Sequence, residues 1–336
     1  MRILVTGGAG YVGSVTVERL LAAGHDVVVV DDLSTGHRAA VAHEATYVDL
    51  HYGDVHAMTR LFVDHHVDAV LHCGAKSVVP ESVADPALYY RENVAGGIAL
   101  LEALREAGVG RFVLSSTAAV YGMPEVVPIT EDAPLRPINP YGETKRTLEA
   151  ALRWYGSAYG LRSVSLRYFN VAGASRANGE VHDPETHLIP NVLRAIETGE
   201  PLTIFGDDYP TPDGTCIRDY IHVEDLARAH LLALEATAPG DARTTGADGT
   251  GLALALNLGN GGGFSVREVV AAAETATGHR VPARLGGRRP GDPPVLVADA
   301  SRAGAVLGWA PTRPEIGDMV ASAFAWRSEH PQGYRA

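Results

Sequence analysis

The chain reads ILVTGGAGYVG from residue 3 to residue 13, and this stretch decides the predicted fold. Its first four residues are apolar or β-branched, which predicts a short strand, and a helical spacing of apolar residues follows as far as Gly24. Gly7, Gly10 and Gly13 lie between the two and predict a tight turn. Glycines at this spacing let backbone N–H groups approach a pyrophosphate at the positive end of a helix. The stretch therefore predicts a dinucleotide site; the alternative is a turn of the same fold that binds no nucleotide.

An acidic residue at the end of the next predicted strand indicates which dinucleotide is bound. Four valines at 27–30 predict that strand, and Asp31 follows them, eighteen positions after Gly13. A carboxylate placed there can accept a hydrogen bond from a ribose 2′-hydroxyl and would repel a 2′-phosphate. We therefore expect NAD rather than NADP.

Apolar runs alternate with helical spacing through the first half of the chain. The runs at 27–30, 69–72 and 111–116 predict further strands with helices between them. Continuous apolar strands that alternate with helices predict an α/β fold with a doubly wound parallel sheet of the Rossmann type. The regularity weakens after Gly173, where Pro, Gly and Asp become frequent, and this change predicts a smaller C-terminal α/β substrate domain.

We expect the two domains to exchange segments of the chain. Residues 1–173, together with about 216–258, are assigned to the NAD-binding domain, because the helical stretch at 223–236 is expected to return to it. Residues 174–215 and 259–336 are assigned to the substrate-binding domain.

Composition and charge exclude several classes of protein. The chain has 336 residues, of which 46% are hydrophobic and 20% charged, and its net charge of −12 disfavours nucleic acid or an anionic membrane as a partner. Two cysteines exclude a disulfide framework, and no apolar run has membrane-spanning length, so we expect a soluble cytoplasmic protein. No His-Glu-x-x-His spacing is present. We therefore expect no metal, and we expect pairs such as His222 and His230 to be surface imidazoles.

A tyrosine and a lysine are predicted to share one face of a helix. Asn139 and Pro140 suit the N-cap and the first position of that helix, which places Tyr141 and Lys145 one turn apart. A neighbouring ammonium and a positively charged nicotinamide both favour the phenolate of a group whose ordinary pKa is about 10. Tyr141 is therefore a candidate general base. A chance pairing is the alternative, but Lys76 and Lys145 are the only lysines in the chain.

A strand-end hydroxyl completes a recognisable set. Ser115, Ser116 and Thr117 end another predicted strand. With the glycine turn, Asp31 and the tyrosine–lysine pair, they resemble the extended short-chain dehydrogenase/reductase family, whose members mostly act on nucleotide sugars. Longer segments over nearly the whole chain resemble the UDP-glucose 4-epimerase branch of that family. These segments are 32–38, 93–96, 115–122, 167–170, 208–223 and 289–292.

The resemblance implies which residues bind the cofactor and the substrate. The implied NAD-binding residues are Gly7, Gly10, Tyr11, Val12, Gly13, Asp31, Asp32, Leu33, Ser34, Thr35, Gly36, Asp54, Val55, Cys73, Gly74, Ala75, Lys76, Asn93, Ser115, Tyr141, Lys145, Tyr168 and Phe169. The implied residues for the UDP-sugar are Thr117, Tyr141, Asn170, His187, Leu188, Phe205, Arg218, Tyr220, Arg289, Asp292 and Leu296. Guanidinium groups suit phosphate oxygens, and an acidic chain needs such fixed cations to hold a dianion.

The resemblance also implies a reaction. UDP-glucose and UDP-galactose would be interconverted by inversion at sugar C4 through a 4-keto intermediate, with NAD tightly bound and the protein a homodimer. Tyr141, directly or through Thr117, would take the proton of the 4-hydroxyl, with Lys145 as the third catalytic residue. Related dehydratases carry acidic residues after the strand-end hydroxyl, where this chain has Ala118 and Ala119. The alternatives are a 4-epimerase specific for UDP-pentoses or UDP-N-acetylhexosamines and a catalytically silent NAD sensor.

Three positions depart from the family pattern and bear on the range of substrates. Position 187 is His where the family usually has Asn, and position 117 is Thr where Ser is frequent. Leu296 stands where the family carries either a bulky Tyr or a small residue beside the 2-substituent of the sugar. Since leucine is shorter than tyrosine, we expect room for an N-acetyl group and UDP-N-acetylglucosamine as a second substrate.

Overall fold

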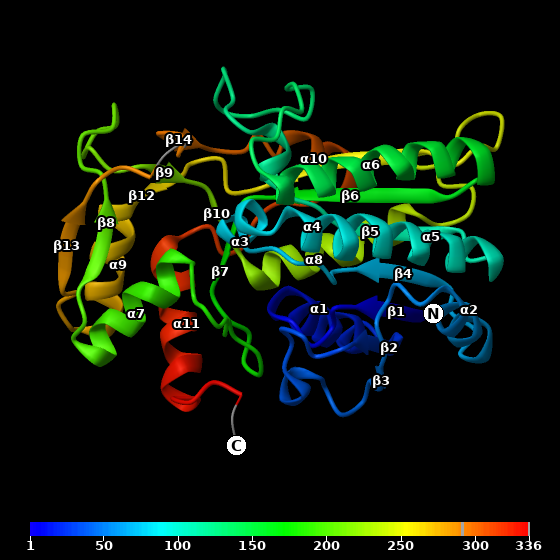
Figure 1. Ribbon diagram of the computed structural model, residues 1–336, viewed down its shortest axis with the longest axis horizontal. Coiled ribbons are helices and arrows are strands. Elements are labelled where there is room, and N and C mark those ends of the chain that lie inside the picture. The colour runs from blue at the N-terminus through cyan, green and yellow to red at the C-terminus, as the bar shows by residue number, and fades with distance from the viewer. Residues whose placement is uncertain (290–291, 335–336) are drawn as a thin grey trace.

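The computed structural model describes residues 1–289 and 292–334 and is built around one parallel sheet (Figure 1). Pro290 and Gly291, which belong to the predicted motif at 289–292, lie outside the described residues. The sheet has seven strands in the order β11-β6-β5-β4-β1-β2-β3, all parallel, so the predicted doubly wound fold is confirmed. The strands are β1 (Arg2–Thr6), β2 (Asp26–Asp31), β3 (Thr46–Asp49), β4 (Ala69–His72), β5 (Arg111–Ser115), β6 (Arg162–Tyr168) and β11 (Ala253–Leu258).

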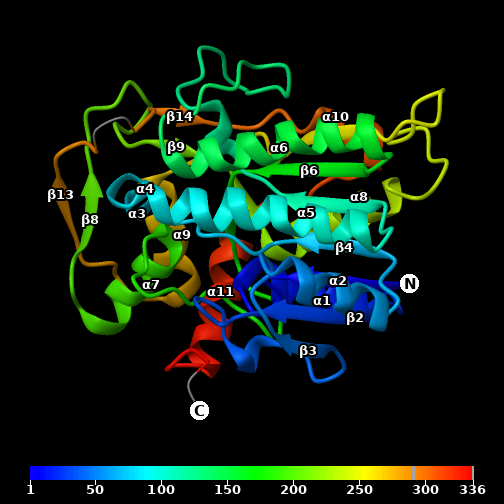
Figure 2. The same ribbon diagram turned by 45° about the vertical axis from the view of Figure 1, so that its right-hand side comes forward.

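Helices cover both faces of this sheet because its strands are apolar on both sides. Ile3 and Val5 of β1 pack in the core beneath α1 (Tyr11–Ala22), α8 (Val223–Ala236) and α10 (Ser301–Leu307). Leu4 points the other way, into the core beneath α2 (Val55–Asp64), α5 (Gly96–Glu106) and α6 (Pro140–Tyr159). Figure 2 shows α5 and α6 in front of the strands and α8 behind them. This alternation is the period-2 pattern of a strand buried on both faces.

A smaller unit lies beyond the carboxyl ends of the strands, on the left in Figure 1. Its core gathers apolar side chains of α7 (Leu188–Thr198), α9 (Val266–Thr277) and α11 (Ile316–Glu329) around β8 (Leu202–Phe205), which pairs in parallel with β13 (Ala283–Gly286). A three-stranded sheet joins β12 (Phe264–Ser265), β9 (Ile217–Arg218) and β14 (Val295–Leu296). The remaining elements are η1 (Arg38–Ala40), α3 (Val79–Ala84), α4 (Pro86–Tyr89), η2 (Tyr90–Ala95), η3 (Ala118–Tyr121), β7 (Asn170–Ala172) and β10 (Tyr220–His222).

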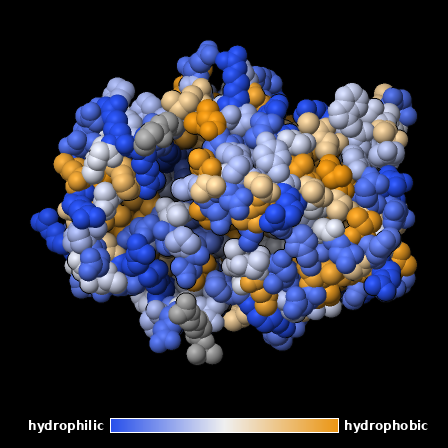
Figure 3. Space-filling model, in the orientation of Figure 1, coloured by the Kyte–Doolittle hydropathy of each residue, from blue (hydrophilic) through white to orange (hydrophobic). Residues whose placement is uncertain are grey.

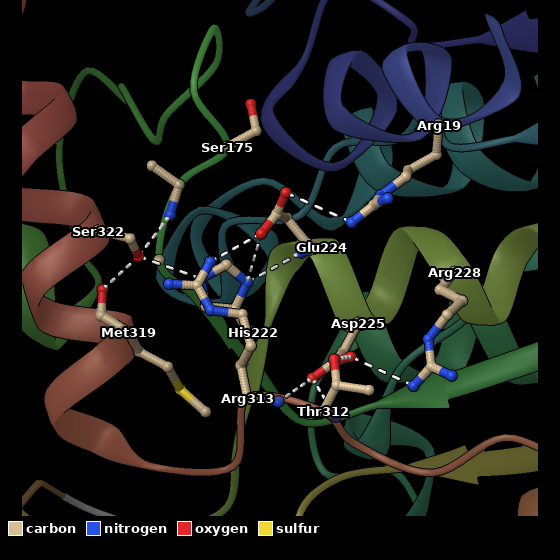
Figure 4. A network of polar contacts seen from close by, with 12 residues as sticks. Arg19, Ser175, His222, Glu224, Asp225, Arg228, Thr312, Arg313, Met319 and Ser322 are labelled. Carbon is tan, nitrogen blue, oxygen red and sulfur yellow. Dashed lines mark hydrogen bonds and ion pairs between the residues drawn. The ribbon is translucent and has the colours of Figure 1, made fainter. Parts of the chain in front are cut away.

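The first turn of α8 ties the two units together (Figure 4). Glu224 accepts hydrogen bonds from Arg19 of α1 at 3.4 Å and from Arg313, just before α11, at 2.7 Å. His222 caps the helix, because its Nδ1 accepts from the Glu224 N–H at 3.1 Å, so its Nε2 carries the proton and faces Ser322 Oγ of α11 at 3.1 Å. This network fixes how the smaller unit sits against the sheet.

The predicted surface position of His222 and His230 is wrong. Both side chains are fully buried, and burial lowers the pKa of each to about 4, so both are neutral near pH 7. His222 is a helix cap, and His230 bonds to Ser115 Oγ at 2.8 Å and to the Leu226 carbonyl at 2.9 Å. A neutral histidine can be buried in a core when each of its two ring nitrogens has a hydrogen-bond partner.

The predicted domain boundaries stay a prediction, and packing suggests one shift in them. The sequence assigns 259–336 to the substrate domain, yet Ala303, Leu307 and Trp309 pack in the core of the larger unit beside α8. A boundary drawn by packing therefore returns residues 301–309 to the larger unit. The predicted helix at 223–236 coincides with α8.

The face in Figure 3 is mostly hydrophilic, and its apolar side chains form small separate groups. Among residues 1–289 and 292–334, no helix is long and apolar enough to cross a membrane. The cellular compartment stays a prediction.

Candidate active site

A cavity with a volume of about 1270 Å³ lies between the two units. It opens at the carboxyl ends of the parallel strands, where β1 stands between β2 and β4 and the direction of winding reverses. Doubly wound folds bind their ligands at this point of the sheet. One side of the cavity comes from the turns after β1, β2 and β4 and from the start of α6, and the other side comes from the smaller unit.

The glycine turn after β1 leaves open backbone beside the cavity. Gly7 has a φ of +68°, and an added Cβ would stand 2.4 Å from the Gly74 nitrogen. A Cβ on Gly13 would stand 2.1 Å from the Gly7 carbonyl oxygen. Because these glycines have no side chains, the backbone N–H groups of the first turn of α1 remain open to the cavity. These residues fit the pyrophosphate of a dinucleotide.

Asp31 is held in place at the end of β2. Its Oδ2 accepts from the Ala9 N–H and its Oδ1 from the Leu33 N–H, both at 2.9 Å. Burial raises the pKa of the Asp31 carboxyl, and the two backbone N–H groups oppose that shift. The carboxylate thus lies at the rim of the glycine turn with its direction fixed, as a ribose contact requires.

The predicted catalytic pair lies on α6 at the middle of the cavity. Asn139 is the N-cap, since its Oδ1 accepts from the Gly142 N–H at 2.8 Å, and Pro140 follows at the first position, as predicted. Tyr141 and Lys145 line the cavity with Thr117. Thr117 Oγ1 accepts from the Ala119 N–H at 3.1 Å.

The surroundings of this pair differ from the sequence-based expectation in one respect. Burial raises the pKa of Tyr141, and a hydrogen bond from Thr117 opposes the shift. Lys145 Nζ donates to the Ser115 carbonyl oxygen at 2.8 Å, and burial lowers its pKa to about 8 although Cys73 and Glu149 oppose this. Within the chain itself, Thr117 rather than Lys145 therefore favours the phenolate, because the ammonium is engaged with the end of β5.

A buried ion pair supports the catalytic helix from behind. Glu149 lies one turn after Lys145 and accepts from Arg167 Nη2 of β6 at 2.5 Å and from Ser116 Oγ at 2.6 Å. Arg167 also donates to the Tyr121 hydroxyl at 2.9 Å. The side chains of Glu149 and Arg167 are only 3% and 4% exposed. The pair locks the ends of β5 and β6 to α6 and so fixes the place of Thr117 and Lys145.

The opposite side of the cavity carries cations that are already engaged. Arg218 forms an ion pair with Asp292 and also donates to the Ile217 carbonyl at 2.7 Å. The Arg289 guanidinium lies 4.1 Å from the centre of the Phe205 ring. An anionic ligand can be held here, since both guanidinium groups border the cavity.

Most of the predicted site residues meet at this cavity. Those that line it are Gly7, Gly10, Tyr11, Val12, Gly13, Asp31, Asp32, Leu33, Ser34, Thr35, Gly36, Cys73, Gly74, Ala75, Lys76, Thr117, Tyr141, Lys145, Tyr168, Phe169, Asn170, His187, Arg218, Arg289, Asp292 and Leu296. Their individual roles stay predictions.

Seven predicted residues lie outside the cavity lining, namely Asp54, Val55, Asn93, Ser115, Leu188, Phe205 and Tyr220. Asp54 caps α2 by accepting from the Ala57 N–H at 3.0 Å, and Val55 begins that helix. Asn93 bonds to both backbone groups of Lys76, at 2.8 and 2.9 Å. Ser115 bonds to the buried His230. Leu188 and Tyr220 pack in the smaller core, and Phe205 lies beneath Arg289.

One wall of the cavity was missed by sequence reasoning. Residues 179–184 line it with Gln332 and Tyr334. The Tyr334 hydroxyl accepts from the Gly179 N–H and contacts the Gly179 carbonyl, both at 3.0 Å. Contacts between segments that are far apart in sequence leave no local pattern. The run Glu180-x-His182-x-x-Glu185-x-His187 was the available signal.

Comparisons with known proteins agree with this geometry. The model of the NAD dependent epimerase/dehydratase family matches residues 3–245. The UDP-glucose 4-epimerase of Streptomyces lividans is 50% identical over 335 residues, which cover 99% of this chain and 98% of that protein. The crystal structure of UDP-glucose 4-epimerase from Brucella ovis in complex with NAD is 44% identical, with a TM-score of 0.90 and coverage of 96% and 97%. That of the Bifidobacterium longum enzyme with NAD⁺ and UDP is 36% identical, with a TM-score of 0.91 and coverage of 99% and 100%.

Fold and cavity together define a Rossmann-fold protein with a tyrosine–lysine pair on one helix face at its nucleotide edge. The chain belongs to the NAD dependent epimerase/dehydratase family.

Proposed function

We propose that this protein interconverts UDP-glucose and UDP-galactose by inverting C4 of the sugar, with NAD as a bound cofactor. The observation that carries the proposal is the shared cavity, in which Tyr141 and Lys145 face a wall with Arg218 and Arg289. Relatives of nearly the same length, about half identical to this chain, bear the name UDP-glucose 4-epimerase, which supports this activity.

The NAD half of the cavity would hold the cofactor by its backbone. The N–H groups of the first turn of α1 would bind the pyrophosphate, and Asp31 would accept a hydrogen bond from a ribose hydroxyl. The chemistry that NAD supplies when bound is the reversible two-electron oxidation of an alcohol carbon.

Proton transfer is the task of Tyr141. Its phenolate accepts the proton of the 4-hydroxyl, directly or through Thr117, when the carbon is oxidised to a ketone, and returns that proton when the ketone is reduced. Lys145, held at 2.8 Å from the Ser115 carbonyl, keeps a positive charge on the same helix face. Burial raises the pKa of Tyr141, and the hydrogen bond from Thr117 opposes this shift. The positive charge of an oxidised nicotinamide would favour the phenolate further.

Inversion requires the sugar to turn while the nucleotide stays bound. Arg218 and Arg289 can bind the negatively charged diphosphate. The 4-keto sugar is neutral and has no charged contact to hold it. Asp292 is placed beside Arg218 to accept from a ribose hydroxyl. Strong binding at one end and weak binding at the other allow the ketone to present either face to the nicotinamide.

The residues after Thr117 favour epimerisation over dehydration. Ala118 and Ala119 both line the cavity and offer no acid or base beside the strand-end hydroxyl. Loss of water from the sugar needs such a group, whereas epimerisation needs only the redox step and its reversal.

Incubation of the purified protein with UDP-galactose and no added NAD tests the proposal. We expect UDP-glucose to accumulate to an equilibrium mixture, with nicotinamide absorbance in the denatured sample. A sample that contains NAD and UDP-sugar but produces no UDP-glucose contradicts the proposed activity.

We extend the proposal to UDP-N-acetylglucosamine because Leu296 lines the cavity. The side chain packs against the apolar cluster of Val120, Tyr121 and Ile129, and it leaves more room than tyrosine would. Parallel assays with both sugars should show turnover of each. Leu296→Tyr should reduce turnover of the acetylated sugar more than that of UDP-glucose, and equal reduction contradicts the role of Leu296.

We also propose a homodimer that uses α6. Trp154 and Tyr159 on this helix are 75% and 60% exposed, and Val83 of α3 is 63% exposed. Large apolar side chains on neighbouring helices suit contact with a second copy. Light scattering after size-exclusion chromatography should give twice the mass of the chain, and a Trp154→Glu variant should give the mass of one chain.

A further inference from the structure

Four potential metal ligands meet in the segment between β7 and α7. They are Glu180, His182, Glu185 and His187, and one donor atom of each lies within 4.8 Å of the others. The segment has no helix or strand before Leu188, so the folded chain and not a helical repeat brings these side chains together. The proposed reaction assigns no chemistry to Glu180, His182 or Glu185.

The spacing of the donor atoms suits one small cation. His182 Nδ1 lies 3.3 Å from Glu180 Oε1 and 3.7 Å from Glu185 Oε2. His187 Nδ1 lies 2.6 Å from Glu180 Oε1 and 3.5 Å from Glu185 Oε1. Zinc bonds of about 2.0–2.1 Å in a tetrahedron separate neighbouring ligands by about 3.3 Å. Three of the four distances are within about 0.4 Å of this value, and the shortest needs a small outward shift of His187.

The two carboxylates of this cluster are buried and need positive charge beside them. The side chains of Glu180 and Glu185 are only 7% and 9% exposed, and two carboxylates so close together repel each other in a poorly solvated place. His182 Nδ1 is buried without a hydrogen bond, although it faces the Glu180 carboxylate. The neighbouring carboxylates raise the pKa of His187 to about 10 and, against its burial, that of His182 to about 9, so both imidazoles carry a proton near pH 7. A divalent ion bound to all four side chains would displace these two protons and leave the charge of the cluster unchanged.

We propose that Glu180, His182, Glu185 and His187 bind a divalent transition-metal ion of the Zn²⁺ class. Two imidazoles and two carboxylates are ligands that zinc accepts, and calcium and magnesium prefer oxygen ligands alone. Four protein ligands fill a tetrahedron, so the ion is structural rather than catalytic. The sequence predicts no metal because the helical His-Glu-x-x-His spacing is absent, and this proposal departs from that expectation.

The bound ion would brace one wall of the cavity. Glu180, His182 and His187 line the cavity, and His187 is the residue from which α7 begins. A metal that joins them closes the segment into a small ring between β7 and α7. The inference does not depend on the identity of the sugar, because none of the four residues is a catalytic group.

Metal content and binding of the NAD-loaded, tag-free protein test the proposal. After removal of metals with a chelator and dialysis, we expect titration with Zn²⁺ to give about one tightly bound equivalent per chain. Titration with Co²⁺ should give the intense visible absorption of tetrahedral cobalt. His182→Gln and Glu185→Gln should each reduce bound zinc to below about a tenth of an equivalent under the same conditions.

His43→Gln is the matched control. His43 forms an exposed pair with Glu44 at 3.0 Å, so its loss removes a histidine–glutamate contact without touching the cluster. This variant should bind zinc as the unmodified chain does. Circular dichroism and bound NAD report whether each variant is folded. Failure of the unmodified chain to bind stoichiometric metal overturns the proposal, as does equal binding by a folded His182→Gln variant.

Discussion

The two sides of the cavity are built by different means. The NAD side is made of backbone: a glycine turn, a helix N-terminus and a carboxylate whose two oxygens are fixed by Ala9 and Leu33. The opposite wall, where we propose that UDP binds and which is called the UDP side here, is made of long side chains whose charges already have partners, since Arg218 pairs with Asp292 and Arg289 stacks on Phe205. The NAD side is therefore formed before its ligand arrives, whereas the proposed binding of UDP would exchange protein contacts for ligand contacts on the other side.

This difference has a thermodynamic meaning for the proposed function. A preformed site loses little conformational entropy on binding and holds its ligand tightly. A site whose arginines must leave internal partners recovers only part of the energy of each phosphate contact. A cofactor that remains bound and a substrate that leaves after each turnover fit this division.

The substitution with the largest expected effect tests whether the proton-transfer step depends on the NAD side alone. Tyr141→Phe should reduce turnover by about 10² to 10⁴-fold, because the ring keeps its packing but loses the proton acceptor. Bound NAD and the KM for UDP-galactose should stay close to the original values. Tyr159→Phe, at an exposed site on the same helix, is the control and should leave turnover unchanged. Turnover within a few-fold of the original for Tyr141→Phe would falsify the assignment of the base.

The second prediction concerns the rigidity of the preformed side. Glu149→Gln leaves Arg167 as a buried charge without its partner and should lower the free energy of unfolding by about 3–5 kcal/mol. Glu143→Gln removes the 2.6 Å pair with Arg146 on the solvent side of the same helix and should lower it by less than about 1 kcal/mol. Urea denaturation measures both changes. Equal effects of the two substitutions would mean that the buried pair does not brace α6.

The third prediction separates the UDP side from the NAD side. Arg218→Gln should raise the KM for UDP-galactose by about 10- to 100-fold, since hydrogen bonds to charged groups contribute about 1.5–3 kcal/mol. The amount of bound NAD should not change. Arg288→Gln is the control, because Arg288 pairs with Asp208 at 2.6 Å and does not line the cavity. Steady-state kinetics measure the KM of both variants. A loss of bound NAD from the Arg218→Gln variant would show that the two sides are not independent.

The smallest expected effect lies at the junction that holds the two sides together. The ordinary pKa of histidine is 6.5, and burial lowers that of His222 to about 4. At a pH between these two values, His222 is protonated in the unfolded chain and neutral in the folded chain. The free energy of unfolding therefore decreases as the pH falls. The contribution is at most about 1.4 kcal/mol per pH unit for one group. His222→Gln should reduce this slope in urea denaturation from pH 6.5 to pH 4, and an unchanged slope would contradict the assignment.

The sequence predicts the preformed side well because its parts are contiguous. The glycine turn, Asp31 and the start of α6 at Asn139 each depend on residues within a few positions of one another, and local geometry decides them. The helical spacing of apolar residues after the turn becomes evident only at Val15, whereas α1 already begins at Tyr11. A glycine within the first turn hides that beginning, because glycine is a poor helix former.

The other side is less predictable because distant segments make it. Arg218 and Asp292 meet through the pairing of β9 with β14, and the wall at 179–184 is held by Tyr334, more than 150 positions away. Asp54, which the resemblance assigns to the cofactor, caps α2 through its carboxylate. Its contact with the cofactor stays a prediction. Neither outcome can be read from spacing, since both depend on which surfaces the fold brings together.

Because lysine is scarce in this chain, amine-reactive reagents can label it at only a few positions. Of the two lysines, Lys145 is buried on α6, whereas Lys76 borders the cavity and reaches toward Ser34 at 3.4 Å. Reagents that acylate amines will therefore attach at Lys76 and the amino terminus. A fluorophore placed there would stand at the rim of the nucleotide cleft, and its emission could report filling and emptying of the pocket without an enzymatic assay.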